Sequence, residues 1–205
     1  MRRNPDIALI MATLLEAEPL LSALSLSPVE EKPFRVYEGG GIRLILSGIG
    51  KARAAMASEY LVLRYGAKFL FNLGAAGSVG GDRRLGEVFH VSRVLERDRP
   101  FLEGRKDRYL EPDHLEGHRP AVLSTADIPV VTPEERAALE GRAELLDMEG
   151  AAVVQAARIF GAAVYLFKVV SDTPDHPSDE DIVRNILEVR HNLCDYFLNR
   201  VLERL

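Results

Sequence analysis

Two carboxylates, Glu149 and Asp172, stand near the two ends of one stretch, residues 145–172. An Ala- and Val-rich run over residues 151–160 predicts a buried helix, and the β-branched and aromatic run after it predicts an interior strand. Glu149 would lie in the first turn of the helix and Asp172 at the carboxyl end of the strand. Ligands of open α/β sheets bind outside the carboxyl ends of strands, so a sugar and a protonatable leaving group could lie there.

Structural explanations exist for the same acids. An acid in a first helical turn is favoured by the helix dipole, and an acid after a strand is often a turn residue. A third acid, Glu16, follows Thr13 in the Thr-x-x-Glu pattern of a capping box. The pattern alone therefore leaves both structural and chemical roles open.

Two glycine-containing stretches could approach a ligand through their backbone. Residues 47–51, Ser-Gly-Ile-Gly-Lys, precede a helix, but their spacing differs from that of a phosphate loop and Ala52 replaces the hydroxyl residue. A turn that brings amides near a ligand remains open there. After the strand expected over residues 68–73, the small residues 74–78 predict a loop that a ligand can approach closely.

Strands and helices alternate along the chain, which predicts one α/β/α sandwich around a mostly parallel or mixed sheet. We find no repeat and no interdomain linker, so residues 1–205 are expected to form a single domain. The remaining expected elements are a strand over residues 7–12, a helix over 14–24, a hairpin over 33–47, a helix over 52–65, strands over 86–95 and 121–131, a helix from Thr132 to Gly141, and a long helix capped by Ser178.

Composition narrows the classes of function. The 205 residues are 47% hydrophobic and 28% charged, with a net charge of −5 and no basic block, which disfavours nucleic acid as a partner. The single cysteine, Cys194, excludes an internal disulfide and fits the cytoplasm. No apolar run is long enough to span a membrane, and acids near the N-terminus argue against a signal peptide. His114 and His118 show no metal-ligand spacing, so neither a metal nor another cofactor is expected.

Five short motifs, taken in order and spacing, resemble the nucleoside phosphorylase and nucleosidase superfamily over nearly the whole chain. The closest likeness is to the bacterial methylthioadenosine/S-adenosylhomocysteine nucleosidases. The motifs are Glu16 after the first strand, Ser47-Gly-Ile-Gly-Lys51, Asn72-Leu-Gly-Ala-Ala-Gly77, Asp147-Met-Glu149 and Val170-Ser-Asp172.

The resemblance implies a role for each matching residue. Glu16 would position and deprotonate the attacking water. Glu149 would accept hydrogen bonds from the ribose hydroxyls, with Met148 against the sugar. Asp172 would protonate the leaving purine at N7, with Ser171 beside it at the base. Hydrolysis of an N-glycosidic bond benefits from such a set, because the purine is a poor anionic leaving group and the sugar develops oxocarbenium character.

Three positions depart from the family pattern. Lys168 stands where the family has an arginine near the water, which keeps the charge but loses the planar fork. Ala75, next to Gly74 in the small-residue stretch, replaces a serine, and Ile128 replaces the aromatic residue that stacks on the base. On an extended strand, the even spacing from Lys168 to Asp172 would place both on one face, where the cation would favour the charged acid.

The leading interpretation is a hydrolase that releases the base of a purine nucleoside, such as 5′-methylthioadenosine or S-adenosylhomocysteine. Relatives with similar signatures cleave futalosine or adenosylhopane, so the substrate stays open. A phosphate-using phosphorylase and a nucleoside-binding sensor are the alternatives, although the phosphorylases' early Gly-Asp-Pro-x-Arg-like stretch is missing. The resemblance also implies a three-layer α/β/α sandwich with a twisted, mixed central sheet, and a homodimer in which part of residues 96–119 reaches the neighbour's site.

Overall fold

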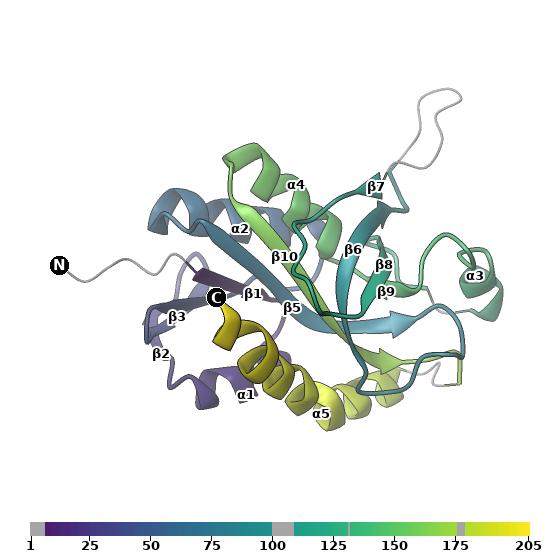
Figure 1. Cartoon of the computed structure of the whole chain (residues 1–205). Helices are drawn as coiled ribbons and strands as arrows, with labels where there is room; N and C mark the ends of the chain where they lie inside the picture. Colours follow the sequence, from purple (N-terminus) through teal and green to yellow (C-terminus); the bar gives the residue numbers. More distant parts are fainter. Residues whose placement is uncertain (1–6, 100–108, 131, 176–178) are drawn as a thin grey trace.

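The computed structural model describes residues 7–99, 109–130, 132–175 and 179–205. Within these ranges one mixed sheet is enclosed by helices, as predicted (Figure 1). The elements are β1 (Ile7–Met11), α1 (Leu14–Ala23), β2 (Ser27–Glu30), β3 (Arg35–Gly39), β4 (Ile42–Leu46), α2 (Lys51–Tyr65), β5 (Phe69–Ser78), β6 (Val88–Glu96), β7 (Tyr109–Leu110), β8 (Pro120–Thr125), α3 (Pro133–Ala137), β9 (Leu145–Asp147), α4 (Gly150–Phe160), β10 (Ala163–Asp172) and α5 (Asp179–Tyr196), followed by a π turn at Phe197–Val201 and a 3-10 turn at Leu202–Arg204.

The sheet combines an open half with a closed circuit of strands. Along the path β10-β6-β8-β9-β5-β1-β4-β3-β2 neighbouring strands are hydrogen-bonded, and β10 also pairs directly with β5. β5 and β10 are therefore shared between the open sheet and a ring that returns through β6, β8 and β9. The pairs of β1 with β4 and β5, and of β5 with β10, are parallel, whereas β5 with β9 and β6 with β10 are antiparallel.

Two helical layers cover the opposite faces of the sheet (Figure 1). On β1, Ala8 and Ile10 pack into a cluster with α2 and α4, whereas the intervening Leu9 and Met11 pack into a cluster with α1 and α5. This alternation is the period of two expected of a strand buried on both faces. The three-layer sandwich expected from the sequence is confirmed. Cys194 is buried in the second cluster, as expected of a small packing residue.

The small residues 74–78 lie within β5, so the loop predicted for them is wrong. β10 pairs with β5 along this whole stretch, from Lys168 opposite Gly74 to Asp172 opposite Gly77. The ladder therefore extends the strand through residues of low β-propensity, because tertiary pairing outweighs that local preference. Close approach of backbone and side chains still requires the glycines, as described below.

Two predicted helices end differently in the structure. The helix beginning at Thr132 has the expected capping box and Pro133, but its α-helical part stops at Ala137. Tight turns follow, and they bring Leu139 and Ala143 into a small cluster with Val79. The last helix changes from α to π geometry after Tyr196. Its predicted cap, residue 178, lies outside the described residues.

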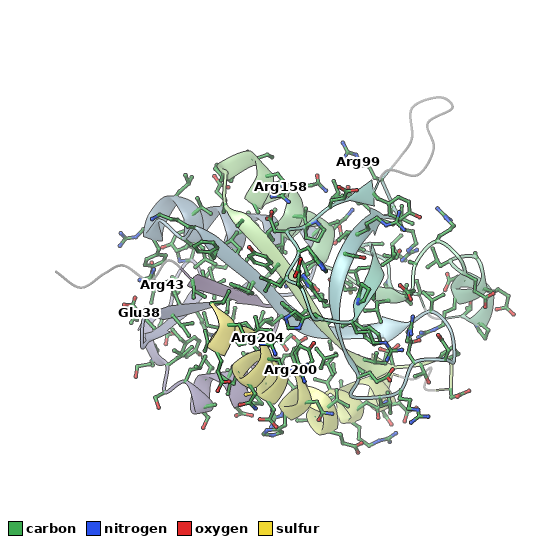
Figure 2. The ribbon with its side chains drawn as sticks, viewed as in Figure 1. Glu38, Arg43, Arg99, Arg158, Arg200 and Arg204 are labelled. Carbon is green, nitrogen blue, oxygen red and sulfur yellow. The ribbon has the colours of Figure 1, made fainter. Side chains whose placement is uncertain are left out.

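Charged side chains mostly project from the rim and the outer helices (Figure 2). Arg158 and Arg200 are exposed examples. Some charged residues are buried, among them Arg43 on β4, which pairs with Glu38 and lies 3.9 Å from the centre of the Tyr65 ring. No helix among the described residues is long and apolar enough to cross a membrane.

Candidate active site

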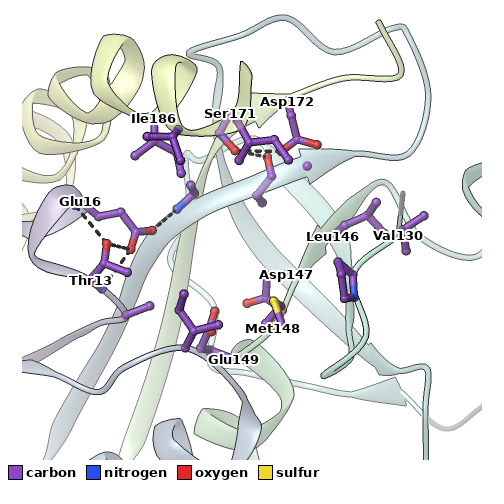
Figure 3. A pocket seen from close by; sticks show the side chains of 18 of the residues that line it. Thr13, Glu16, Val130, Leu146, Asp147, Met148, Glu149, Ser171, Asp172 and Ile186 are labelled. Carbon is purple, nitrogen blue, oxygen red and sulfur yellow. Dashed lines mark hydrogen bonds between the residues drawn. The ribbon is translucent and has the colours of Figure 1, made fainter. Parts of the chain in front are cut away.

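A pocket of about 370 Å³ lies where the carboxyl ends of several strands meet (Figure 3). Its walls come from the end of β1, from the second half of β5, and from the ends of β8, β9 and β10, with α5 above. This is the position that the parallel-strand rule predicts for a ligand. Seven of the nine residues predicted for the site border it: Glu16, Ala75, Ile128, Met148, Glu149, Ser171 and Asp172.

Glu16 uses its two carboxylate oxygens on different neighbours. Oε2 accepts hydrogen bonds from the backbone N–H of Thr13 at 3.1 Å and from its hydroxyl at 2.7 Å, which completes the capping box. Oε1 accepts the backbone N–H of Ala75 on β5 at 2.9 Å. The cap predicted as the structural explanation is therefore present, and the same side chain also borders the pocket.

Glu149 precedes α4 and makes no side-chain capping bond to that helix. Its Oε1 instead accepts the backbone N–H of Gly50 at 2.8 Å. Burial raises the pKa of Glu149 to about 7, and the nearby carboxylate of Asp147 adds to the shift. Glu149 is thus the N-cap residue and not, as the sequence predicted, a residue of the first turn, and it lies in the pocket wall beside Met148 (Figure 3).

Lys168 lies behind the pocket wall and does not border the pocket. Its Nζ is 2.8 Å from Oδ2 of Asp147, and both side chains are 1% exposed. Burial disfavours the ammonium, but Asp147 and Glu149 outweigh that effect and raise the pKa of Lys168. Nζ also lies near Glu16, since a Cβ on Gly74 would be 3.7 Å from Nζ and 3.1 Å from Oε1 of Glu16. The lysine thus neutralises part of a cluster of carboxylates.

The expected proximity of Lys168 to Asp172 is wrong. The ladder between β5 and β10 is irregular between Val170 and Asp172, so Ser171 is an extra residue there. Such a bulge shifts the alternation of side chains, and even spacing no longer implies a shared face. Lys168 pairs with Asp147, whereas the cation beside Asp172 comes from α3.

Asp172 is held from both sides of its carboxylate. Oδ2 accepts a hydrogen bond from Nη2 of Arg136 at 2.8 Å, and Oδ1 accepts the Ser171 hydroxyl at 3.0 Å. A Cβ on the opposite residue, Gly77, would lie 2.6 Å from Oδ2, so only glycine leaves room for the acid there. Asp172 is not a turn residue: it ends β10 and is 7% exposed.

Backbone amides of residues 47–51 donate hydrogen bonds to carboxylates of the protein. The N–H of Gly50 binds Glu149, and the N–H of Lys51 binds Asp127 at 2.8 Å. The Lys51 ammonium is 3.0 Å from Glu96 and 2.6 Å from Asp98. These contacts join the loop to the end of β6 and fix the pocket wall that carries Glu149. The sequence left open whether the amides of this loop approach a ligand. In the structure they bind carboxylates of the protein, and one of these, Glu149, borders the pocket.

Three buried polar residues near the pocket were not predicted from the sequence. Asp147 belongs to a quoted motif but was given no role, although it accepts hydrogen bonds from Thr125 at 2.6 Å and from the N–H of Gly150 at 2.8 Å. Arg136 lies in a helix otherwise rich in exposed charges, so its pattern gave no sign of burial. Thr125, at the end of β8, was read only as part of a strand.

Three carboxylates on three walls can act on one ligand in three different ways. Glu16 lies on the wall of α1, Glu149 on the wall of β9 and α4, and Asp172 on the wall of β10 (Figure 3). One acid can orient water, one can bind hydroxyl groups, and one can exchange a proton with a leaving group. Among the described residues no group of His, Cys, Asp and Glu has a metal-binding arrangement.

Known proteins resemble the chain along most of its length. The 5′-methylthioadenosine/S-adenosylhomocysteine nucleosidase of Arabidopsis thaliana is 26% identical, covering 96% of this chain and 90% of that protein. The futalosine hydrolase of Thermus thermophilus is 32% identical, covering 75% of this chain and 77% of that protein.

Solved structures share the fold. The 5′-methylthioadenosine/S-adenosylhomocysteine nucleosidase of Helicobacter pylori, with butyl-thio-DADMe-Immucillin-A, superposes with a TM-score of 0.85 at 18% identity and covers 97% of this chain and 98% of that one. The native futalosine hydrolase of the same organism superposes with a TM-score of 0.85 at 18% identity and covers 97% of this chain and 97% of that one. A family model, that of the phosphorylase superfamily, matches residues 6–127 and 118–203. The chain therefore belongs to the phosphorylase superfamily.

Proposed function

We propose that the protein hydrolyses the N-glycosidic bond of a purine nucleoside of the 5′-methylthioadenosine or S-adenosylhomocysteine type and releases the free base. The observation that carries this proposal is the placement of Glu16, Glu149 and Asp172 on separate walls of one pocket at the carboxyl ends of the strands. The relatives named above are hydrolases of such nucleosides or of futalosine by name.

Each acid has one step in the proposed reaction. Asp172 donates a proton to N7 of the purine as the bond from the sugar to N9 breaks, and the electron pair of that bond passes to the base. Glu149, once ionised, accepts the ribose hydroxyls and steadies the oxocarbenium-like sugar. Glu16 accepts a proton from the water that attacks the sugar carbon. A pKa of about 7 leaves Glu149 partly charged at neutral pH.

Water rather than phosphate is the proposed nucleophile. The backbone N–H of Ala75 is occupied by a carboxylate oxygen of Glu16, at the place where a phosphorylase would use a serine for phosphate. A negative side chain repels a phosphate dianion but accepts a proton from water. Intact Glu16, Glu149 and Asp172 also favour an enzyme over a silent nucleoside sensor.

The test is a panel of purine nucleosides assayed for free base, with and without phosphate. We expect base release at the same rate in both buffers, with a free sugar product and no sugar 1-phosphate. A strict phosphate requirement would support the phosphorylase alternative. Tight binding without any base release would support the sensor.

Futalosine is the second candidate substrate, favoured by the 32% identity to the futalosine hydrolase of Thermus thermophilus. The pocket has an apolar side that fits a large 5′ substituent, since α5 contributes Ile182, Val183 and Ile186 beside Leu15 and Ile49. Including futalosine in the panel decides between the two substrates by their relative kcat/KM.

The remaining proposals concern the assembly. We take residues 1–205 as one catalytic domain that works as a homodimer in the cytoplasm, without nucleic acid or cofactor. The family likeness and the buried lone Cys194 support this view. Residues 100–108 of the segment proposed to reach the neighbouring site lie outside the described residues.

A further inference from the structure

Arg136 is a buried arginine that reaches from α3 to the end of the sheet. It is 4% exposed, and its guanidinium donates one hydrogen bond to the carbonyl of Ser78 and another to Oδ2 of Asp172. α3 lies beside the ends of β5 and β10 in Figure 1. One side chain therefore connects this short helix to the last residues of two strands.

α3 has other anchors besides this arginine. The helix has its own capping box between Thr132 and Glu135, and the turns after it pack Leu139 against Val79. Taking a charged pair out of water costs free energy, and apolar residues of similar size often replace such pairs without loss of stability. The pair with Asp172 thus calls for an explanation beyond packing.

The chemistry of the two partners supplies that explanation. A guanidinium has only N–H donors and no acceptor, so it cannot face a carboxyl oxygen that carries a proton. Oδ2, held by Arg136, must then be the unprotonated oxygen. The proton can reside only on Oδ1, which lies 3.0 Å from the Ser171 hydroxyl. That hydroxyl can donate to the ionised oxygen or accept from the protonated one.

We propose that Arg136 is a positioning residue that fixes the orientation of the Asp172 carboxyl and directs its proton to Oδ1, toward the leaving base. The inference rests on the proposed function. During the reaction the Oδ1–H bond breaks as the N7–H bond forms, and the guanidinium stays on Oδ2 while the carboxylate regains its charge. Gly77 contributes by leaving space for Oδ2 beside the β5 backbone.

The test compares two substrates that differ in their need for a proton. A purine nucleoside needs the acid, whereas a 4-nitrophenyl riboside has a leaving group that departs without protonation. We expect Arg136→Met to lower kcat on the purine nucleoside by about 10²-fold, the size typical of a misplaced catalytic group, with KM changed by less than about threefold. On the nitrophenyl riboside, kcat should fall by less than about threefold. Asp172→Asn serves as the reference and should show the same selectivity with a larger loss.

Arg83→Met is the matched control. Arg83 is also a largely buried arginine of this region, but its guanidinium pairs with Glu144. Its variant should keep the wild-type ratio of the two substrates. Arg136→Lys should restore part of the purine activity, because lysine keeps one charged donor but loses the fork. Equal losses on both substrates, or the same selectivity in Arg83→Met, would overturn the proposal.

Two further measurements decide the matter if Arg136→Met does not fold or the wild-type enzyme releases no base. Gly77→Ala displaces the same oxygen and should reproduce the loss that is specific to the purine. A crystal structure of Arg136→Met, where that variant folds, reports the Asp172 orientation without any activity, and a carboxyl that stays in place without the guanidinium would refute the positioning role. If the wild-type protein releases no base and the variant has a displaced Asp172 carboxyl, the proposed function is refuted but the positioning role is not.

Discussion

Glu16 both closes a capping box and borders the pocket. The cap occupies Oε2, and Oε1 reaches across to the Ala75 amide. Because the two oxygens have different partners, a capping-box pattern in the sequence does not exclude a catalytic role. The question that the pattern left open therefore becomes one that a single substitution can answer.

Glu16→Gln separates the two roles. Glutamine can still close the capping box with its carbonyl, but its amide cannot accept the N–H of Ala75 or take a proton from water. We expect turnover to fall by about 10²–10⁴-fold, as for loss of a general base, and the free energy of unfolding to fall by about 1 kcal/mol. Steady-state kinetics and urea denaturation measure the two quantities.

The chain offers a matched control in its second capping box. Glu135→Gln changes the same position of the same motif on α3, at an exposed site away from the pocket. It should leave turnover unchanged. Near-normal turnover in Glu16→Gln itself would show that the residue is only a cap.

Single residues were predictable where a short motif identified them. Glu149, Asp172 and Glu16, which border the pocket, were predicted from their positions at strand and helix ends and from the family pattern. Asp147 and Arg136 were not, because their importance comes from burial and from partners distant in sequence. A charged residue in an acidic, turn-rich segment gives no local sign that the tertiary fold will cover it.

At the scale of elements, the sequence predicted most strands and helices but not how long the pairing of β5 and β10 runs. Small residues at 74–78 suggested a loop, and only the partner strand shows that the ladder continues. The bulge at Ser171 was equally hidden, and it moves Asp172 away from Lys168 and toward Arg136. Irregular pairing is a property of two strands together, so periodicity along one strand does not reveal it.

A buried histidine fastens the segment before β8 to the sheet. His90 on β6 is fully buried: its Nδ1 lies 3.0 Å from the carbonyl of Leu166, and its Nε2 accepts the N–H of Leu115 at 3.0 Å. Its ring stacks on Phe167 and faces His114 and His118. An imidazole that accepts at one nitrogen and donates at the other is neutral.

This arrangement predicts loss of stability in mild acid. Burial lowers the pKa of His90 from 6.5 to about 4. Between these values the unfolded chain binds more protons than the folded one, so the free energy of unfolding falls as the pH decreases and is unaffected above about pH 7.5. We expect His90 to contribute about 2 kcal/mol to the difference between pH 7.5 and pH 5. Urea denaturation of wild type and His90→Gln at both pH values measures this contribution.

The exposed His191 provides the comparison for that measurement. His191→Gln should retain the wild-type difference between the two pH values, whereas His90→Gln should reduce it. An unchanged difference in His90→Gln would mean that other groups cause the acid sensitivity.

At the scale of the whole molecule, the outer face of α2 carries apolar side chains that the fold leaves uncovered. Met56 and Leu63 are 51% and 65% exposed, and Ile159, at the end of the adjacent α4, is 76% exposed. α2 and α4 lie side by side in one layer (Figure 1). Ile49, just before α2, borders the pocket, so a second subunit packed on this face would lie close to the pocket.

The homodimer proposed from the family likeness would bury this face. Light scattering should report about twice the 22.7 kDa chain mass. Met56→Glu with Leu63→Glu should shift the protein toward monomers, because charged side chains in an interface core are costly to desolvate. Val29→Glu is the control: Val29 is 53% exposed on the separate strand β2, and its variant should remain dimeric. Monomers formed in this way that kept full kcat/KM on the preferred nucleoside would show that each pocket is complete within one chain. The part of residues 96–119 that was expected to reach the neighbouring site would then have no role in catalysis.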